Sequence, residues 1–205
     1  MGSAHVHPKQ ERSAICLLSS ETVNGTILFH QSTECDLVRV RFYLQGPPNE
    51  THAIHIHEFG DTRHGCDSLG PHFNPFHKTH GSLLYNMPRH VGDLINNITF
   101  NQYGRFIYEY DDELITLFTE DSIYGRSIVI HEGEDDLGLG KGSKREESLK
   151  TGNAGKRICC GIIACCACDQ PATGFSKNQF GAQIVKNDAA GENAPLMRKN
   201  TWYTA

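Results

Sequence analysis

The segment Thr51–His57, with the sequence Thr-His-Ala-Ile-His-Ile-His, alternates isoleucine with histidine over its last four positions. Side chains two positions apart on a β-strand point to the same face, about 7 Å apart at a rise of ~3.3 Å per residue. Ile54 and Ile56 therefore face one side of the predicted strand, and His55 and His57 face the other. Two neutral imidazoles side by side can bind one first-row transition metal ion. The segment thus predicts a strand with an apolar face and a metal-binding face.

Short segments rich in β-branched and aromatic residues recur on both sides of this strand. Turns containing Gly, Asn, Asp and Pro separate them, and helical periodicity is absent. Seven or eight such strands predict an all-β chain, built as an antiparallel sandwich or barrel. The further predicted strands are residues 14–18, 25–30, 37–44, 105–108, 115–118 and 127–131.

Two long segments interrupt this rhythm, residues 58–93 and residues 132–156. Loops of this length in a compact domain are usually functional or disordered. The first segment holds further candidate metal ligands, which favours a function, whereas the second is charged and glycine-rich. The candidate ligands are His72, His80, His90 and Asp93.

The chain has 205 residues and a formal net charge of −5, with both signs mixed along it. This length suits one domain with a proper core. The charge offers no basic patch for nucleic acid, and the longest apolar run, residues 158–168, is too short to span a bilayer. No apolar segment near the start predicts a signal peptide, and the clustered cysteines do not suit a secreted framework. We therefore expect a cytoplasmic protein with no nucleic-acid and no membrane partner.

A polar tail with few strand signals begins near residue 169. We therefore expect three parts in the chain. These are an N-terminal flank at residues 1–10, a barrel at residues 11–168 and a C-terminal extension of unknown role at residues 169–205.

Several longer motifs follow one another over about residues 11–167. They are His-Ile-His-Glu-Phe-Gly-Asp at 55–61, Gly-Pro-His-Phe-Asn-Pro at 70–75, Arg-His-Val-Gly-Asp-Leu at 89–94, Val-Ile-His at 129–131, Asp-Asp-Leu-Gly at 135–138 and Lys-Thr-Gly-Asn-Ala-Gly-Lys-Arg at 150–157. In these residues and in their order the chain resembles the copper,zinc superoxide dismutase family of the cytosolic, eukaryotic type.

The resemblance implies an eight-stranded antiparallel Greek-key β-barrel, an immunoglobulin-like sandwich, with long metal-binding and electrostatic loops. It implies one copper and one zinc per subunit, with His72 bridging both metals as an imidazolate. Asp135 would lie outside the ligand sets and link a copper histidine to a zinc histidine. The implied copper ligands are His55, His57, His72 and His131, and the implied zinc ligands are His72, His80, His90 and Asp93.

The resemblance also implies an antioxidant enzyme, which converts superoxide to dioxygen and hydrogen peroxide by alternate reduction and oxidation of copper. The implied catalytic residues are His72, Arg157 and Thr151. His72 would take up a proton when its bond to copper breaks. Arg157 would hold the superoxide anion by a charge-assisted hydrogen bond, and Thr151 would line the approach with Lys150 and Lys156.

The resemblance further pairs Cys66 with Cys160 in a disulfide that ties the metal-binding loop to the last strand. It implies a homodimer with contacts in residues 59–61, 123–125 and 161–164. An apolar last strand that ends at an exposed edge is consistent with such a two-fold interface.

Two other functions remain open alternatives. Cys166-Ala-Cys168 resembles the CxC motif of the family's copper chaperones, so a dismutase-like copper chaperone is one, and a non-catalytic copper- and zinc-binding module is the other. The complete copper ligand set argues against the first, and Arg157 with Thr151 argues against the second. The family's need for a copper chaperone has been linked to a proline just after the active-site arginine. Ile158 stands there in this chain, which predicts that a chaperone is not required.

Overall fold

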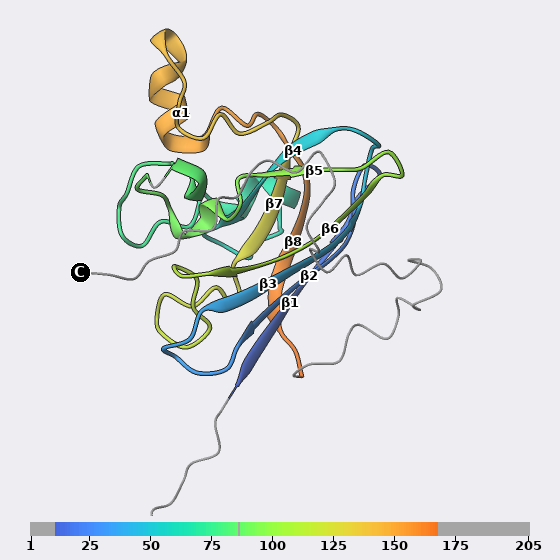
Figure 1. Ribbon diagram of the computed structural model, residues 1–205, viewed down its shortest axis with the longest axis vertical. Coiled ribbons are helices and arrows are strands. Elements are labelled where there is room, and N and C mark those ends of the chain that lie inside the picture. The colour runs from blue at the N-terminus through green and yellow to red at the C-terminus, as the bar shows by residue number, and fades with distance from the viewer. Residues whose placement is uncertain (1–10, 86, 168–205) are drawn as a thin grey trace, which may run out of the picture. The chain divides into compact units, whose positions relative to one another are not determined.

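The computed structural model describes residues 11–85 and 87–167 (Figure 1). The expected flank at residues 1–10, the extension at residues 169–205 and Cys168 lie outside the described residues. The predicted boundaries of the three parts therefore stay predictions.

Eight antiparallel strands form one sheet that curls into a nearly closed barrel (Figure 1). Their order in the sheet is β5-β4-β7-β8-β1-β2-β3-β6, so β6 lies beside β3, and β7 lies beside β4. Because these neighbours are not consecutive in the chain, the connections between them cross over, as in the expected Greek key. The strands are β1 (Arg12–Ser19), β2 (Asn24–Gln31), β3 (Val38–Gln45), β4 (Thr51–His57), β5 (Asn97–Thr99), β6 (Arg105–Asp112), β7 (Ser127–His131) and β8 (Arg157–Cys165).

Alternation along each strand decides which side chains enter the core. In β3, Val38, Val40, Phe42 and Leu44 are buried, and the residues between them are exposed or half-buried. Strand β4 differs, because every residue after Thr51 is buried. One face of β4 joins the apolar core, and long loops cover the other face, where His55 and His57 lie.

Two elements depart from the predicted strands. Residues 115–118 form a loop, although Ile115 and Leu117 are as buried as strand residues. The backbone N–H of Leu117 donates to the Gln31 side chain at 2.7 Å, in place of a neighbouring strand. Strand β5 has three residues and is too short to show a period, so the sequence did not predict it.

The last strand, β8, lies between β7 and β1. The expectation that it ends at an exposed sheet edge is therefore wrong. The large apolar side chain that β8 exposes is Ile162, which is 41% accessible.

The two long loops pack against the barrel and contain the short helices. Phe73 donates its backbone N–H to the Ile56 carbonyl of β4 at 2.8 Å, and a disulfide joins Cys66 to Cys160 of β8, as the resemblance implied. No helix among the described residues has the length and apolarity needed to cross a membrane. The helices are η1 (Gly65–Leu69), η2 (Leu83–Tyr85), η3 (Val91–Asp93), η4 (Gly142–Lys144) and α1 (Arg145–Thr151).

A buried ion pair fastens the first long loop to β6. Arg89 donates to the carboxylate of Asp112 at 2.9 Å, and both side chains are almost inaccessible to water. Asp112 also accepts the backbone N–H groups of Leu114 and Ile115. The pair holds the segment that carries His90 at a fixed place on the barrel.

Replacing Asp112 with asparagine should lower the free energy of unfolding by about 3 kcal/mol or more, because the Arg89 charge would stay buried without its partner. Urea denaturation measures this loss. The matched control is Asp111→Asn, which weakens an exposed pair with Arg39 (3.0 Å) and should cost less than about 1 kcal/mol. Equal losses in the two variants would contradict the assignment of the buried pair as the stronger anchor.

Candidate metal centre

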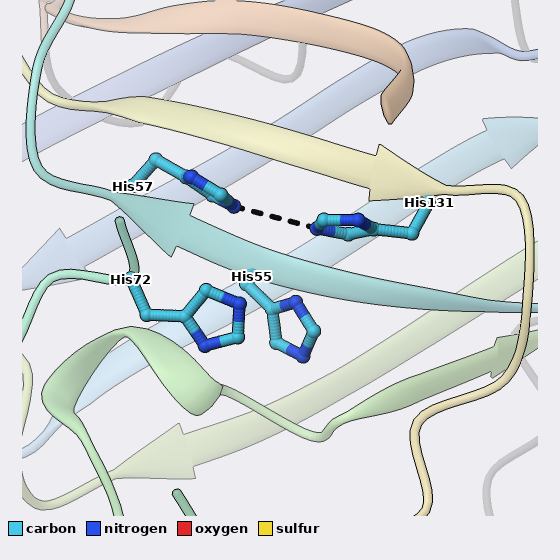
Figure 2. Close-up of side chains that lie close together, drawn as sticks. All are labelled: His55, His57, His72 and His131. Atoms are coloured by element: carbon cyan, nitrogen blue, oxygen red, sulfur yellow. Dashed lines mark hydrogen bonds between the residues drawn. The ribbon is translucent and has the colours of Figure 1, made fainter. Parts of the chain in front are cut away.

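Four histidines meet on the face of β4 that points away from the apolar core (Figure 2). His55 and His57 come from β4, and His131 ends β7 beside it. His72 comes from the first long loop, where its backbone pairs with that of His57. All four are buried, and their ligand nitrogens lie within 4.8 Å of one another.

In two of these rings, the Nδ1 atom carries the proton of the neutral ring, so neither Nε2 atom has one. The Nδ1 atom of His57 donates to the Gly70 carbonyl at 2.8 Å, and that of His131 donates to the Gly155 carbonyl at 3.1 Å. Each neutral ring therefore presents a lone pair at Nε2, and the two Nε2 atoms are 3.3 Å apart (Figure 2). Two lone pairs at this distance repel unless a cation is shared between them.

The other two histidines of this group carry nitrogens without a partner. Among the described residues, His55 Nδ1 and His72 Nε2 are buried and make no hydrogen bond. Buried polar atoms are rarely left in this state, and such exceptions often mark a bound ion. The donor set and the orphaned nitrogens fit a transition metal ion.

A second group surrounds the carboxylate of Asp93. The Nδ1 atoms of His72, His80 and His90 lie 3.1, 2.9 and 3.1 Å from one oxygen of Asp93, its Oδ1. The other oxygen accepts the backbone N–H groups of Gly81 and His90, which fixes the carboxylate. Three imidazoles and one carboxylate are the donors of a closed tetrahedral zinc site.

Asp135 joins the two groups. Its carboxylate accepts from His55 Nε2 at 2.7 Å and from His80 Nε2 at 2.8 Å, so both rings present Nδ1 to their metal groups. Asn96 donates to the same carboxylate at 2.9 Å. Gly152 passes so close that a Cβ atom there would collide with the Asp135 carboxylate, and its φ of 67° is one that glycine adopts without strain.

Burial keeps the first group of histidines neutral. It lowers the pKa of His72 to about 3 and that of His131 to about 4, and neighbouring histidines add to both shifts. The pKa values of His55 and His57 are also lowered, again mainly by burial. Because a metal binds only the neutral ring, these shifts favour metal over protons at the first group.

The second group holds negative charge. Burial alone would raise the pKa of Asp93, but hydrogen bonds with His72, His80 and His90 hold it well below its usual range. Burial would likewise lower the pKa of His80, but hydrogen bonds with Asp135 and Asp93 raise it to about 10. A cation is therefore favoured here, either a proton on His80 or a metal ion.

A cleft of about 440 Å³ opens onto the first group. Arg157 lies in its wall and donates to the carbonyls of Cys66 and Gly70, each at 2.6 Å. Thr151 lines the cleft, as expected, whereas Lys150 and Lys156 are not among its lining residues. The lining residues are His57, Pro71, His72, Glu147, His131, Thr151, Asn153, Ala154, Gly155 and Arg157.

Arg126 makes contacts beside the histidine group that the sequence did not reveal. Its guanidinium lies 3.5 Å from the centre of the Phe73 ring and donates to the Glu58 carbonyl at 3.0 Å. Glu58 follows His57 and Phe73 follows His72, so Arg126 braces the chain next to two ligands of the first group. No signal in the sequence distinguishes it from other half-buried arginines.

The structure thus brings together every residue of both predicted ligand sets, with His72 in both and Asp135 between them. An antiparallel barrel with two histidine-rich groups that share one histidine defines a protein with a pair of linked metal sites. His64 and His77, which lie in the same long loop, are exposed and belong to neither group.

Comparison with known proteins identifies the family. The family described as "Copper/zinc superoxide dismutase (SODC)" matches residues 23–163. A Cu-Zn superoxide dismutase of Onchocerca volvulus is 48% identical over 152 residues, which is 74% of this chain and 95% of that protein. That of Saccharomyces cerevisiae is 46% identical, over 73% of this chain and 96% of its own. The chain belongs to the copper/zinc superoxide dismutase family.

The metal-free protein should lose stability as the pH falls from about 6.5 towards about 4. The folded forms of His72 and His131 have a lowered pKa, so below about pH 6.5 the unfolded chain binds protons that the folded chain does not. Each histidine then lowers the free energy of unfolding by up to about 1.4 kcal/mol per pH unit. Urea denaturation at several pH values measures the slope, and His131→Gln should reduce it. An unchanged slope in that variant would show that His131 is not a source of the effect.

Proposed function

We propose that this protein converts superoxide to dioxygen and hydrogen peroxide at a copper site that shares His72 with a zinc site. The observation that carries this conclusion is the position of His72. Its Nδ1 faces Asp93, its Nε2 faces the group of four histidines, and the ring lines the cleft that holds Arg157.

The donor sets assign the two metals. His55, His57, His72 and His131 would hold copper, whose nitrogen ligands suit both of its oxidation states, and the Asp93 group would hold zinc. Copper, when bound, supplies the alternating oxidation states that dismutation requires, whereas zinc supplies charge without redox chemistry. The zinc ligands would be His72, His80, His90 and Asp93.

His72 is the residue placed to hold a proton. Its Nδ1 is engaged near Asp93, and its Nε2 has no partner among the described residues, so a proton at Nε2 would face the cleft. A proton there lies where an anion that enters the cleft would need one. This supports the predicted catalytic role of His72.

Arg157 supplies the positive charge of the cleft. Two backbone carbonyls hold its guanidinium in place, and a guanidinium has five N–H donors, so donors remain for a small anion. The carbonyl of Gly70 accepts from both Arg157 and His57, and it therefore fixes the anion site relative to a copper ligand. At the cleft wall, the Thr151 hydroxyl donates to the Glu147 carboxylate at 2.7 Å. This hydrogen bond orients the carboxylate towards Thr151.

The two alternatives have less support. A copper chaperone must release its metal, whereas the four histidines here are buried and braced by hydrogen bonds to backbone and carboxylate. A non-catalytic module would not need an arginine held at the mouth of the copper group. Dismutation uses all of these features.

Replacing Arg157 with alanine should slow superoxide decay by about tenfold or more, because one charge-assisted hydrogen bond contributes roughly 1.5–3 kcal/mol. Decay is followed after a radiolytic pulse, with protein of known copper and zinc content at several salt concentrations. Both metals should remain bound, and added salt should slow the unchanged protein more than the variant. The matched control is Arg39→Ala on β3, a strand that contributes no residue to the cleft lining, and this change should leave the rate unchanged.

Two results of this experiment would be decisive. Unchanged decay in Arg157→Ala would remove Arg157 from its proposed role. No acceleration by the unchanged protein with copper fully bound would overturn the dismutase function itself.

We also propose a homodimer built on an exposed apolar patch of Leu17, Phe59 and Ile162. These side chains are 62%, 49% and 41% accessible, respectively. Cys16 pairs with Ile163 across β1 and β8, so Leu17 and Ile162 are neighbours, and Gly60 lies against Ile162. A patch of this kind on a barrel face suits a two-fold contact.

Replacing Ile162 with arginine should convert the dimer to a monomer, because it places a charge at the centre of the patch. Sedimentation equilibrium gives the mass. The matched control is Ile107→Arg, since Ile107 is 53% exposed on β6 at the far end of the sheet from β8. A monomeric unchanged protein would refute the dimer, and an Ile162→Arg dimer would place the interface elsewhere.

Two further expectations stay predictions. One is the cytoplasmic location, and one similar protein, 46% identical over 154 residues, is an extracellular dismutase of Brugia pahangi. The other is copper loading without a dedicated chaperone. Expression in a host that lacks such a chaperone, followed by copper analysis, tests the second.

A further inference from the structure

Asn97 occupies an unusual place between the sheet and the second long loop. It begins the three-residue strand β5, where its backbone pairs with Ala53 of β4. Its side chain turns to the backbone of Asp135: the Asn97 Nδ2 donates to the Asp135 carbonyl at 3.0 Å, and the Asp135 N–H donates to Asn97 Oδ1 at 2.8 Å. One side chain thus pairs with both backbone groups of one residue.

This pairing imitates a rung of β-sheet. A carboxamide has one acceptor and a neighbouring donor, in the same arrangement as a peptide group, so Asn97 extends the sheet edge by one residue without a further strand. Asp135 itself lies outside any strand, in the loop after β7. The loop is therefore fastened at this point by a side chain of the barrel.

The carboxylate of the fastened residue orients both metal groups. Asp135 accepts from His55 of the first group and from His80 of the second, at 2.7 and 2.8 Å. The neighbour of Asn97, Asn96, donates to the same carboxylate at 2.9 Å. The two asparagines thus hold Asp135 at both its backbone and its side chain.

We propose that Asn97 is a positioning residue. It fixes the backbone of Asp135 and thereby keeps the His55 and His80 rings of the two metal-binding groups correctly oriented. The inference rests on the proposed copper and zinc sites. Its consequence is that one change in the barrel, with no contact to any ligand, affects both metals. If Asn97 only stabilised the barrel, its replacement would lower the stability of the protein and leave the binding of both metals unchanged.

The experiment compares Asn97→Ala with a control from the same strand. Thr99→Ala removes the hydroxyl contact of Thr99 with Thr51 (2.9 Å) and touches neither metal group. Zinc and copper affinities are measured in the full chain at equilibrium against chelators of known affinity. The Cu(II) electron paramagnetic resonance spectrum is recorded for each zinc- and copper-loaded protein.

Asn97→Ala should weaken the binding of both metals by about tenfold, the lower end of the range for residues that support ligands. It should also change the Cu(II) spectrum, because the His55 ring loses its fixed partner. Thr99→Ala should retain the affinities and the spectrum. If Asn97→Ala does not fold, Asn97→Ser, which keeps a hydroxyl near the Asp135 N–H, should show the same changes to a smaller extent.

The outcomes separate the two proposals. Unchanged affinities and an unchanged spectrum in the Asn97 variants, with or without lower thermal stability, would overturn the positioning role alone. A loss of copper and zinc affinity equal to that of Thr99→Ala would also overturn the positioning role. Failure of the unchanged protein to bind copper and zinc would overturn the proposed function as well.

Discussion

The hydrogen bonds that Asp135 accepts from His55 and His80 determine the geometry of the whole centre. Each bond fixes a proton on Nε2 and so directs the Nδ1 lone pair of that ring to a metal group. The same bonds join β4 to two loops that are far apart in the sequence. Because Asp135 is buried, its charge needs hydrogen-bond donors, and if the loops moved apart it would lose both histidines.

Without metals, several histidine nitrogens of the folded protein consequently lack a favourable partner. The facing lone pairs of His57 and His131 repel, and the buried nitrogens His55 Nδ1 and His72 Nε2 make no hydrogen bond to any described residue. Apolar packing of the barrel must offset these costs until ions bind. Metal binding then stabilises the folded state directly, because the unfolded chain has no preformed site.

Much of this arrangement could be predicted from the sequence. Alternation in β4 predicted which face carries His55 and His57, and the family motifs placed the remaining candidate ligands, which the structure brings together. Contacts between side chains and backbone were beyond prediction. The bond of Leu117 to Gln31 replaced an expected strand, and Arg126 supports the ligand loops through a ring and a carbonyl that no spacing reveals.

The complete burial of His80 and Asp93 also bears on how metals leave the protein. His80 and Asp93 are inaccessible to solvent while the loops are in place, so we expect an ion held by them to exchange only after a local opening of the chain. The rate of exchange would then report how often residues 58–93 detach from β4, and not how strongly the ligands hold the ion. Changes far from the metals, such as loss of the Arg89–Asp112 pair, would speed exchange while leaving the coordination itself intact.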